Sequence, residues 1–178
     1  PEVMARASIS HKPDAGIGGD GSGLAGALAE MAATRPEDFQ FLQAQIRTVL
    51  PDVQGVRLQR SQYTENRWVP VESVKNAQLY AHTEESQWGY EMVLDMACGD
   101  DIPACAASEG TLLVIGLLAI LVHSKRPALI LLENIEHGLH PRALAELVGL
   151  LRRLLERYPE TQIVATSHSP YLLDHFHP

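Results

Sequence analysis

Two short apolar runs, each ending in polar residues, dominate the hydrophobic pattern of the C-terminal half of the chain. Residues 128–132 pass directly into Glu133-Asn134, and residues 163–165, preceded by Gln162, lead into Thr166-Ser-His168. Such runs suit strands that are covered on both faces, and adjacent parallel strands bring their carboxyl ends to one edge of a sheet. The pattern therefore predicts a parallel strand pair with a ligand site at that edge.

Helices are predicted before and after the strand at residues 128–132. Residues 112–122 are almost continuously apolar, but the run is shorter than the roughly 20 residues of a membrane-spanning helix, so it predicts a buried core helix. Ser108 stands at the N-cap position and Glu109 in the first turn of that helix. A further helix is predicted over residues 142–158, with Pro141 in its first turn and its leucines on one face.

The N-terminal half begins with a Gly-rich stretch and two predicted helices. Gly16–Gly21 fits G-x-G-x-x-G, but no buried strand precedes it, so we interpret it as part of an entry loop. The spacing from Leu24 onward predicts a helix capped by Ser22, and a second helix follows Pro36.

Residues 54–95 change to the alternating pattern of strands. Polar stretches at residues 64–67 and 84–86 are interpreted as turns, so an antiparallel sheet of several strands is predicted. The aromatic residues Trp68, Tyr80 and Trp88 are not interleaved with enough Arg or Lys for stacking on nucleobases, and we expect them to pack on a core or a sheet face.

Composition narrows the class without choosing a function. The chain has 178 residues, 46% of them hydrophobic and 20% charged, as expected for one globular domain with a core. Its formal charge of −8 argues against a broad nucleic-acid surface on this piece. Cys98 and Cys105 fit no disulfide framework or metal spacing, which favours a reducing cytoplasm. No signal-peptide pattern is present.

Four segments together resemble the C-terminal lobe of an ABC-type ATPase head of the RecF/SMC-like and OLD-like AAA kind (AAA_21 type). Ala107-Ser-Glu-Gly-Thr111 resembles the signature loop and residues 128–133 the Walker B strand. Gly138-Leu-His-Pro141 resembles the D-loop, and Thr166-Ser-His-Ser-Pro170 the switch-histidine loop. The four occur in the family's order and spacing.

The resemblance implies an α/β fold: the C-terminal lobe of an ABC-type P-loop NTPase, with parallel strands, flanking helices and a small antiparallel β region. We expect an entry loop at 1–23, a helical pair with an antiparallel β segment at 24–106, and the signature, Walker B and switch-histidine core at 107–178. No G-x-x-x-x-G-K-[ST] occurs in the chain. The N-terminal Walker A lobe is therefore expected elsewhere in a longer protein, of which this chain would be a fragment.

The resemblance also assigns roles in ATP hydrolysis. Glu133 would hold Mg²⁺ through water and His168 would contact the γ-phosphate. A second carboxylate usually orients the attacking water, but Asn134 is an amide, so this role is empty or moves to Glu136.

The resemblance assigns the remaining candidate residues to an ATP molecule that binds between two subunits. Ser108, Glu109 and Gly110, at a helix N-terminus, would contact the nucleotide of a partner subunit, and His140 is a further candidate contact. ATP and Mg²⁺ are the implied cofactors, and the implied partners are the N-terminal lobe, a second copy joined through ATP, and DNA in the parent protein, with no membrane. The parent would be a cytoplasmic ATPase in DNA repair or phage defence, and this fragment alone would be inactive.

Two alternatives stay open. The lobe could be a non-catalytic interaction module with vestigial ATPase motifs, which Asn134 favours. It could also be a metal-dependent hydrolase with ligands at Glu133, Glu136, His137 and His140. Gly138 and Pro141 would then interrupt any helix able to align the two histidines as in His-Glu-x-x-His.

Overall fold

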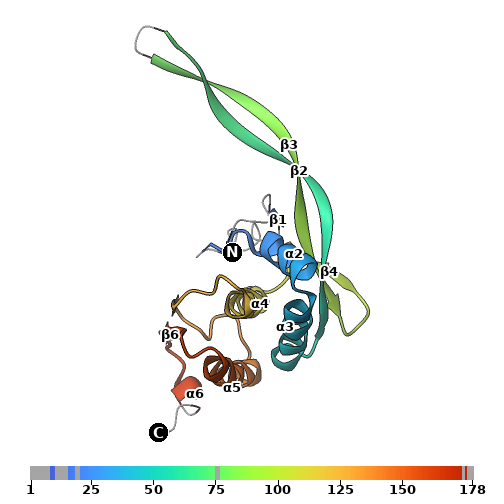
Figure 1. Ribbon diagram of the computed structural model, residues 1–178, viewed down its shortest axis with the longest axis vertical. Coiled ribbons are helices and arrows are strands. Elements are labelled where there is room, and N and C mark those ends of the chain that lie inside the picture. Colours follow the sequence, from blue (N-terminus) through green and yellow to red (C-terminus); the bar gives the residue numbers. More distant parts are fainter. Residues whose placement is uncertain (1–8, 11–15, 19–20, 75–76, 174, 176–178) are drawn as a thin grey trace.

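A long antiparallel hairpin projects from a body of helices and a small parallel sheet (Figure 1). This structure is a computed structural model that describes residues 9–10, 16–18, 21–74, 77–173 and 175. Most of the expected entry loop at residues 1–23 lies outside the described residues. The elements in chain order are β1 Ile9–Ser10, α2 Leu24–Thr34, α3 Pro36–Val49, β2 Val53–Val74, β3 Ala77–Met96, β4 Asp101–Pro103, the 3-10 turn η1 Ala104–Ala106, α4 Glu109–Val122, β5 Leu129–Leu132, α5 Pro141–Arg157, β6 Gln162–Ala165 and α6 Pro170–Leu173.

The two N-terminal helices form where the spacing predicted them, and α3 packs against α2, α4 and α5. Pro36 lies in the first turn of α3, where its missing N–H would have had no partner within the helix. The predicted Ser22 cap of α2 is wrong. The N-cap is Gly23, at a φ of 83°, one residue beyond Ser22. The chain enters α2 through a left-handed turn, which costs glycine no steric penalty.

The structure confirms antiparallel pairing over residues 54–95, but the segment forms two long strands where several shorter ones were predicted. β2 and β3 pair from Val53 opposite Met96 to Val74 opposite Ala77. The polar residues 64–67 and 84–86, predicted as turns, lie within the strands: residues 64–66 pair with residues 84–86, and Arg67 pairs with Thr83. A projecting two-stranded ribbon has water on both faces, so polar residues can continue its strands. On a sheet that covers a core, the same residues would mark turns.

Trp88 was expected to pack on a core or a sheet face, and it lies on a face of the ribbon and not in a core. Its side chain is 57% exposed, and the guanidinium of Arg60 lies 5.2 Å from the centre of its ring. The side chains of Trp68 and Tyr80, which carried the same expectation, lie outside the described part of the structure.

Helix α4 lies in the hydrophobic core, as the apolar run predicted. Val114, Ile115, Leu118 and Leu121 are fully buried, and together with leucines of α5 they belong to one buried cluster. In the described part of the chain, no helix combines the length and the apolar character that crossing a bilayer requires. Ile130 of β5 and Ile135 of the loop after it belong to the same buried cluster, which anchors both segments.

Strands β5 and β6 pair in parallel, as predicted, with Ile130 opposite Ile163. The expectation that β5 is covered on both faces is wrong for this chain: Ile130 is buried, whereas Leu129 and Leu131 are 49% and 72% exposed. These two side chains and the exposed Val164 form what we call the open sheet face. Only two strands form this sheet among the described residues, and the helices cover one side of it.

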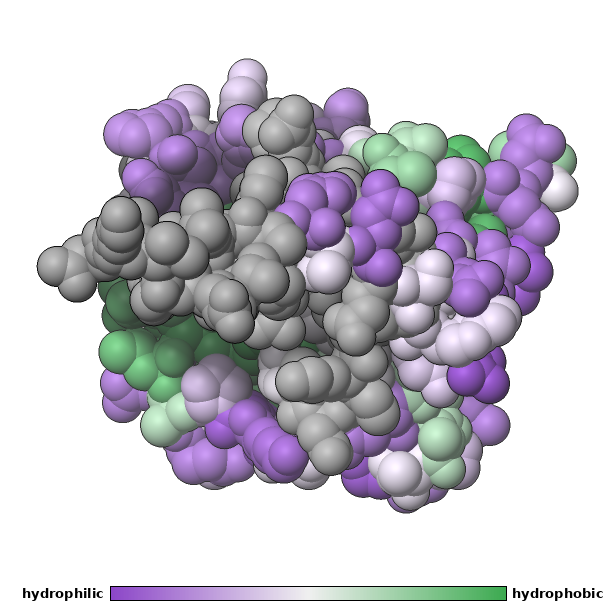
Figure 2. Space-filling view, turned by 90° about the horizontal axis from the view of Figure 1, so that it is seen from above, coloured by the Kyte–Doolittle hydropathy of each residue, from purple (hydrophilic) through white to green (hydrophobic). Residues whose placement is uncertain are grey.

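A cavity of about 710 Å³ lies beside the open sheet face. Its walls are mainly apolar and come from β5, the partly exposed side of α4 and residues 16–18. Figure 2 shows hydrophobic surface on its left side. This is also the side on which β6 lies in Figure 1. The apolar residues that predicted a doubly covered strand thus border an open hollow.

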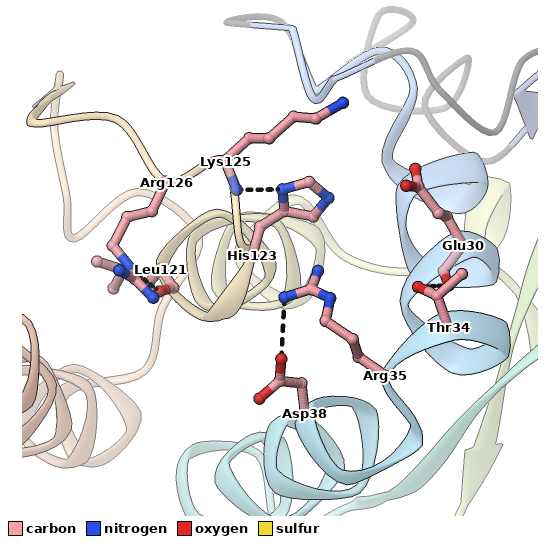
Figure 3. A network of polar contacts seen from close by, with 8 residues as sticks. All are labelled: Glu30, Thr34, Arg35, Asp38, Leu121, His123, Lys125 and Arg126. Atoms are coloured by element: carbon pink, nitrogen blue, oxygen red, sulfur yellow. Dashed lines mark hydrogen bonds and ion pairs between the residues drawn. The ribbon is translucent and has the colours of Figure 1, made fainter.

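His123 is a buried histidine at the C-terminal end of α4 (Figure 3). Its Nδ1 accepts a hydrogen bond from the backbone N–H of Lys125, with 3.1 Å between the nitrogen atoms. Burial lowers the pKa of His123 below its ordinary value, and the positive charge of Arg35 lowers it further, while Glu30 acts in the opposite direction. The neutral imidazole is therefore the form that the fold favours.

We expect the free energy of unfolding to decrease as the pH falls below the ordinary histidine pKa of 6.5. The unfolded chain binds a proton on His123 at that pH, whereas the folded chain binds it only at lower pH, so protonation favours unfolding. One such group contributes at most about 1.4 kcal/mol per pH unit. Denaturant titrations between about pH 7 and pH 5 should show a shallower decrease for His123→Gln. An unchanged slope in His123→Gln would contradict the expectation.

Candidate functional site

The loops that follow β5 and β6 are joined by hydrogen bonds at the carboxyl edge of the sheet. The Thr166 N–H donates to the carbonyl of Leu132 (3.0 Å), and the Ile135 N–H donates to the carbonyl of Thr166 (3.2 Å). The Asn134 N–H donates to the Thr166 hydroxyl at 3.1 Å. Ile135 is buried and anchors its loop in the core. The structure therefore brings Glu133-Asn134 and the loop of His168 to one edge, as the strand pattern predicted.

The two residues at the end of β5 differ in backbone conformation and exposure. Glu133 is exposed, so its carboxylate is available to a ligand. Asn134 is half-buried and has a φ of 51°, the single positive φ of a non-glycine residue in the described part of the chain. Asparagine tolerates this left-handed region better than most residues. The amide at this position thus suits the turn, whatever it does in chemistry.

Glu136 binds the backbone of the opposite loop. Its Oε1 accepts a hydrogen bond from the His168 N–H at 2.7 Å. That hydrogen bond lowers the pKa of Glu136, and the Ser167 side chain lowers it further. The other oxygen, Oε2, is buried and has no partner in hydrogen-bond geometry among the described residues. Glu136 is thus a held carboxylate, unlike the exposed Glu133.

The N-terminus of α4 carries the predicted cap and a side-chain contact between Glu109 and His137. The Ser108 hydroxyl accepts a hydrogen bond from the Thr111 N–H at 3.1 Å, which confirms Ser108 as the N-cap, and Ser108 itself is exposed. Glu109 lies 2.8 Å from Nε2 of His137, and this contact lowers the pKa of Glu109. This hydrogen bond connects the signature segment to the loop that follows β5.

Gly110 and Gly138 bring the same two segments into backbone contact. A Cβ at Gly110 would lie 2.2 Å from the carbonyl oxygen of Gly138 and 2.6 Å from its carbonyl carbon. Gly138 has a φ of 69°, and a Cβ there would lie 2.8 Å from the nitrogen of Gly110. Glycine at both positions permits this approach. The Gly138-Leu-His-Pro141 segment therefore covers Gly110 and leaves Ser108 as the exposed end of α4.

We expect Gly110→Ala to destabilise the protein by about 1–3 kcal/mol, because the methyl group meets backbone atoms that cannot rotate away. Gly149, in the interior of α5, is the matched control, since a Cβ there would meet only Nη1 of Arg153, at 3.6 Å. Gly149→Ala should stabilise by roughly 0.5–1 kcal/mol through helix propensity. Denaturant titration measures both changes. Equal stability of Gly110→Ala and the unmodified protein would show that the two segments separate easily.

His140 and Pro141 form the start of α5, as the sequence predicted for the proline. Nδ1 of His140 accepts a hydrogen bond from the Arg142 N–H at 3.3 Å, so His140 is the N-cap, and its side chain is exposed. The metal-hydrolase alternative finds no support in this geometry. Among the residues that the structure describes, no three His, Cys, Asp or Glu side chains gather as a metal site.

The sequence did not predict what Thr166 and His137 do at this edge, although it placed Thr166 in the switch-histidine segment and offered His137 as a metal ligand. Thr166 joins the two loops through its hydroxyl and its carbonyl, and His137 pairs with Glu109. A threonine directly after an apolar strand was a visible but weak signal. The contact between Gly110 and Gly138 had no signal in the sequence, because glycine has many other uses.

Comparisons with known proteins find a family model similar to the C-terminal part of the chain. A family model described as "AAA domain, putative AbiEii toxin, Type IV TA system" matches residues 94–174. The comparison with curated proteins gives no match.

Two solved structures share the fold. One is the crystal structure of the Smc head domain with an extended coiled coil bound to the C-terminal domain of ScpA, derived from Pyrococcus furiosus. It has a TM-score of 0.52 and 14% sequence identity over 83% of this chain, which spans 32% of the length of that chain. The other comes from work on the structural biochemistry of ATP-driven dimerization and DNA stimulated activation of SMC ATPases. It has a TM-score of 0.51 and 13% identity, and covers 84% of this chain and 78% of that one. At these identities the likeness shows an α/β fold similar to these heads.

Proposed function

We propose that this chain belongs to the ATP-binding and ATP-hydrolysing head of a longer protein. The chain is related to the ABC-type and SMC-like P-loop ATPases. One observation carries the proposal: the loops after β5 and β6 and the N-terminus of α4 are joined at one edge of the body. The segments that resemble the Walker B and switch-histidine motifs are therefore neighbours in space, as an ATP site of one subunit requires. The segments that resemble the D-loop and signature motifs adjoin them at the same edge.

The exposed side chains at this edge suit the roles that ATP hydrolysis needs. Glu133 is an exposed carboxylate at the end of a strand, and carboxylate oxygen is a ligand that Mg²⁺ prefers, so its residue type fits a water-mediated contact. When bound, Mg²⁺ supplies charge neutralisation on the phosphates. His168 is also exposed, and we assign its imidazole to the γ-phosphate. Asn134 leaves the water-orienting role without a carboxylate, which predicts slow hydrolysis.

Ser108 at the exposed end of α4 supports dimerisation through ATP. A helix N-terminus favours a phosphate through its free N–H groups and its dipole. Since Gly138 covers Gly110, the exposed part of this N-terminus is Ser108, which a second subunit can reach from the solvent. We propose that Ser108 and Glu109 cap a nucleotide that the partner subunit holds. His140, another exposed N-cap, is a further candidate contact.

The phosphate-cradling loop has to come from an N-terminal lobe of the same ATPase, because residues 1–178 contain no Walker A motif. The open sheet face and its cavity support this: exposed apolar side chains on a parallel sheet are a surface that another lobe can cover. We expect residues 1–178 alone to bind Mg-ATP weakly or not at all in calorimetry. An affinity in the low micromolar range would contradict the need for that lobe.

The exposed thiols and the charge fit the rest of the proposal. Cys98 and Cys105 are free and exposed, as in a reducing cytoplasm. With a charge of −8, any DNA contact of the parent protein in repair or phage defence would lie on other parts of it.

A non-catalytic interaction lobe is the second candidate, and Asn134 favours it. The amide cannot accept a proton from water, and it suits the left-handed turn it occupies. An ATPase assay on the full-length protein separates the two, because a non-catalytic lobe would show no turnover that His168→Ala could remove.

A further inference from the structure

The loop of His168 is joined to the loop after β5 at two successive points. Thr166 makes the first, through backbone and hydroxyl hydrogen bonds to residues 132–135. The second lies two residues further on, where the His168 N–H donates to Oε1 of Glu136 at 2.7 Å. Between them, Ser167 accepts a hydrogen bond from the Ser169 N–H within its own loop. Glu136 is thus the side chain that fixes the backbone of the histidine itself.

The geometry of Glu136 does not suit a general base. One oxygen accepts a hydrogen bond from the His168 N–H and the other is buried, so the carboxylate is poorly placed to take a proton from a water that attacks a phosphate. A pKa below the ordinary range also makes this carboxylate a weaker proton acceptor. The imidazole of His168, by contrast, is exposed, while its backbone is held.

We propose that Glu136 is a positioning residue, whose carboxylate holds the backbone of His168 so that the imidazole meets the terminal phosphate of the nucleotide. This role rests on the proposed function and differs from that of a base replacing Asn134. The neighbouring His137 pairs with Glu109 at the N-terminus of α4. One short loop therefore holds the switch histidine on one side and the signature segment on the other.

Steady-state ATP hydrolysis by full-length protein distinguishes positioning from base catalysis. Glutamine keeps an oxygen acceptor at the same distance from the backbone, so Glu136→Gln should keep kcat within about threefold. Glu136→Ala removes the acceptor and should lower kcat by about 10- to 100-fold, the scale of a lost hydrogen bond to a charged group. If Glu136→Gln lost about 10²- to 10⁴-fold, as removal of a general base does, the positioning role would be overturned.

Two further measurements separate this role from general loss of structure. In a His168→Ala background, Glu136→Ala should change kcat little, because the residue through which it acts is gone; a further tenfold loss would overturn the proposal. Hydrogen exchange of residues 166–172 should be faster in Glu136→Ala than in Glu136→Gln, and equal rates would also overturn it. Exchange does not depend on turnover. An unmodified protein without ATPase activity would therefore overturn the proposed function and the catalytic part of this role, while the exchange rates would still report on the contact.

Discussion

Replacing Asn134 by glutamate is expected to raise the ATP hydrolysis rate of the full-length protein by about 10²- to 10⁴-fold, the usual contribution of a general base. The substitution puts a carboxylate at the strand end, next to Glu133, where it can orient and polarise a water in line with the γ-phosphate. The full gain is expected because Glu136 is engaged with His168 and does not already fill the role. Phosphate release at saturating Mg-ATP measures the change. His168→Ala should lower turnover in either background.

The backbone at Asn134 gives this experiment its controls. Glutamate fits the left-handed φ of 51° less well than asparagine and should cost roughly 1–2 kcal/mol of stability. Asn134→Gln brings a comparable strain without a carboxylate, so it should lose stability and gain no activity. Asn134→Asp adds a shorter carboxylate that tolerates this backbone. A protein that hydrolyses ATP rapidly as it stands, and loses activity on Asn134→Glu, would show that Asn134 is not at the water-orienting position.

Replacing Ser108 by arginine is expected to abolish ATP-driven dimerisation and leave ATP binding by a single subunit nearly intact. Ser108 is exposed at the end of α4 that we assign to the partner's phosphate, and a long side chain there would separate the two subunits. Light scattering of the full-length protein with a slowly hydrolysed ATP analogue measures the effect.

The control for Ser108→Arg has to account for the lost helix cap. Ser108→Ala removes the hydroxyl that accepts from the Thr111 N–H and should cost about 1 kcal/mol of stability. Alanine adds no bulk, so its dimer should form, although less tightly. If Ser108→Arg dimerises like the unmodified protein, this segment only caps a helix.

The sequence by itself determined the features that depend on near neighbours in the chain. The apolar runs that gave α4, β5 and β6, the prolines that start α3 and α5, and the Ser108 cap all act within a few residues. Polar residues directly after two adjacent parallel strands also meet at one edge whatever surrounds the sheet, so the place of the site could be predicted.

Only the tertiary structure decided which side chains at that edge are held and which are free. Glu136 and His168 are 32 residues apart in the chain, and Glu109 and His137 are 28 apart. Whether such pairs meet depends on how the loops pack. The sequence does not distinguish an exposed glutamate from one that is engaged in a hydrogen bond. The extent of the hairpin and the open sheet face depended on packing too. The exposure of a side chain depends on segments that lie far away in the sequence. Polar residues could therefore continue the strands of the hairpin, and apolar residues of β5 and β6 could remain uncovered.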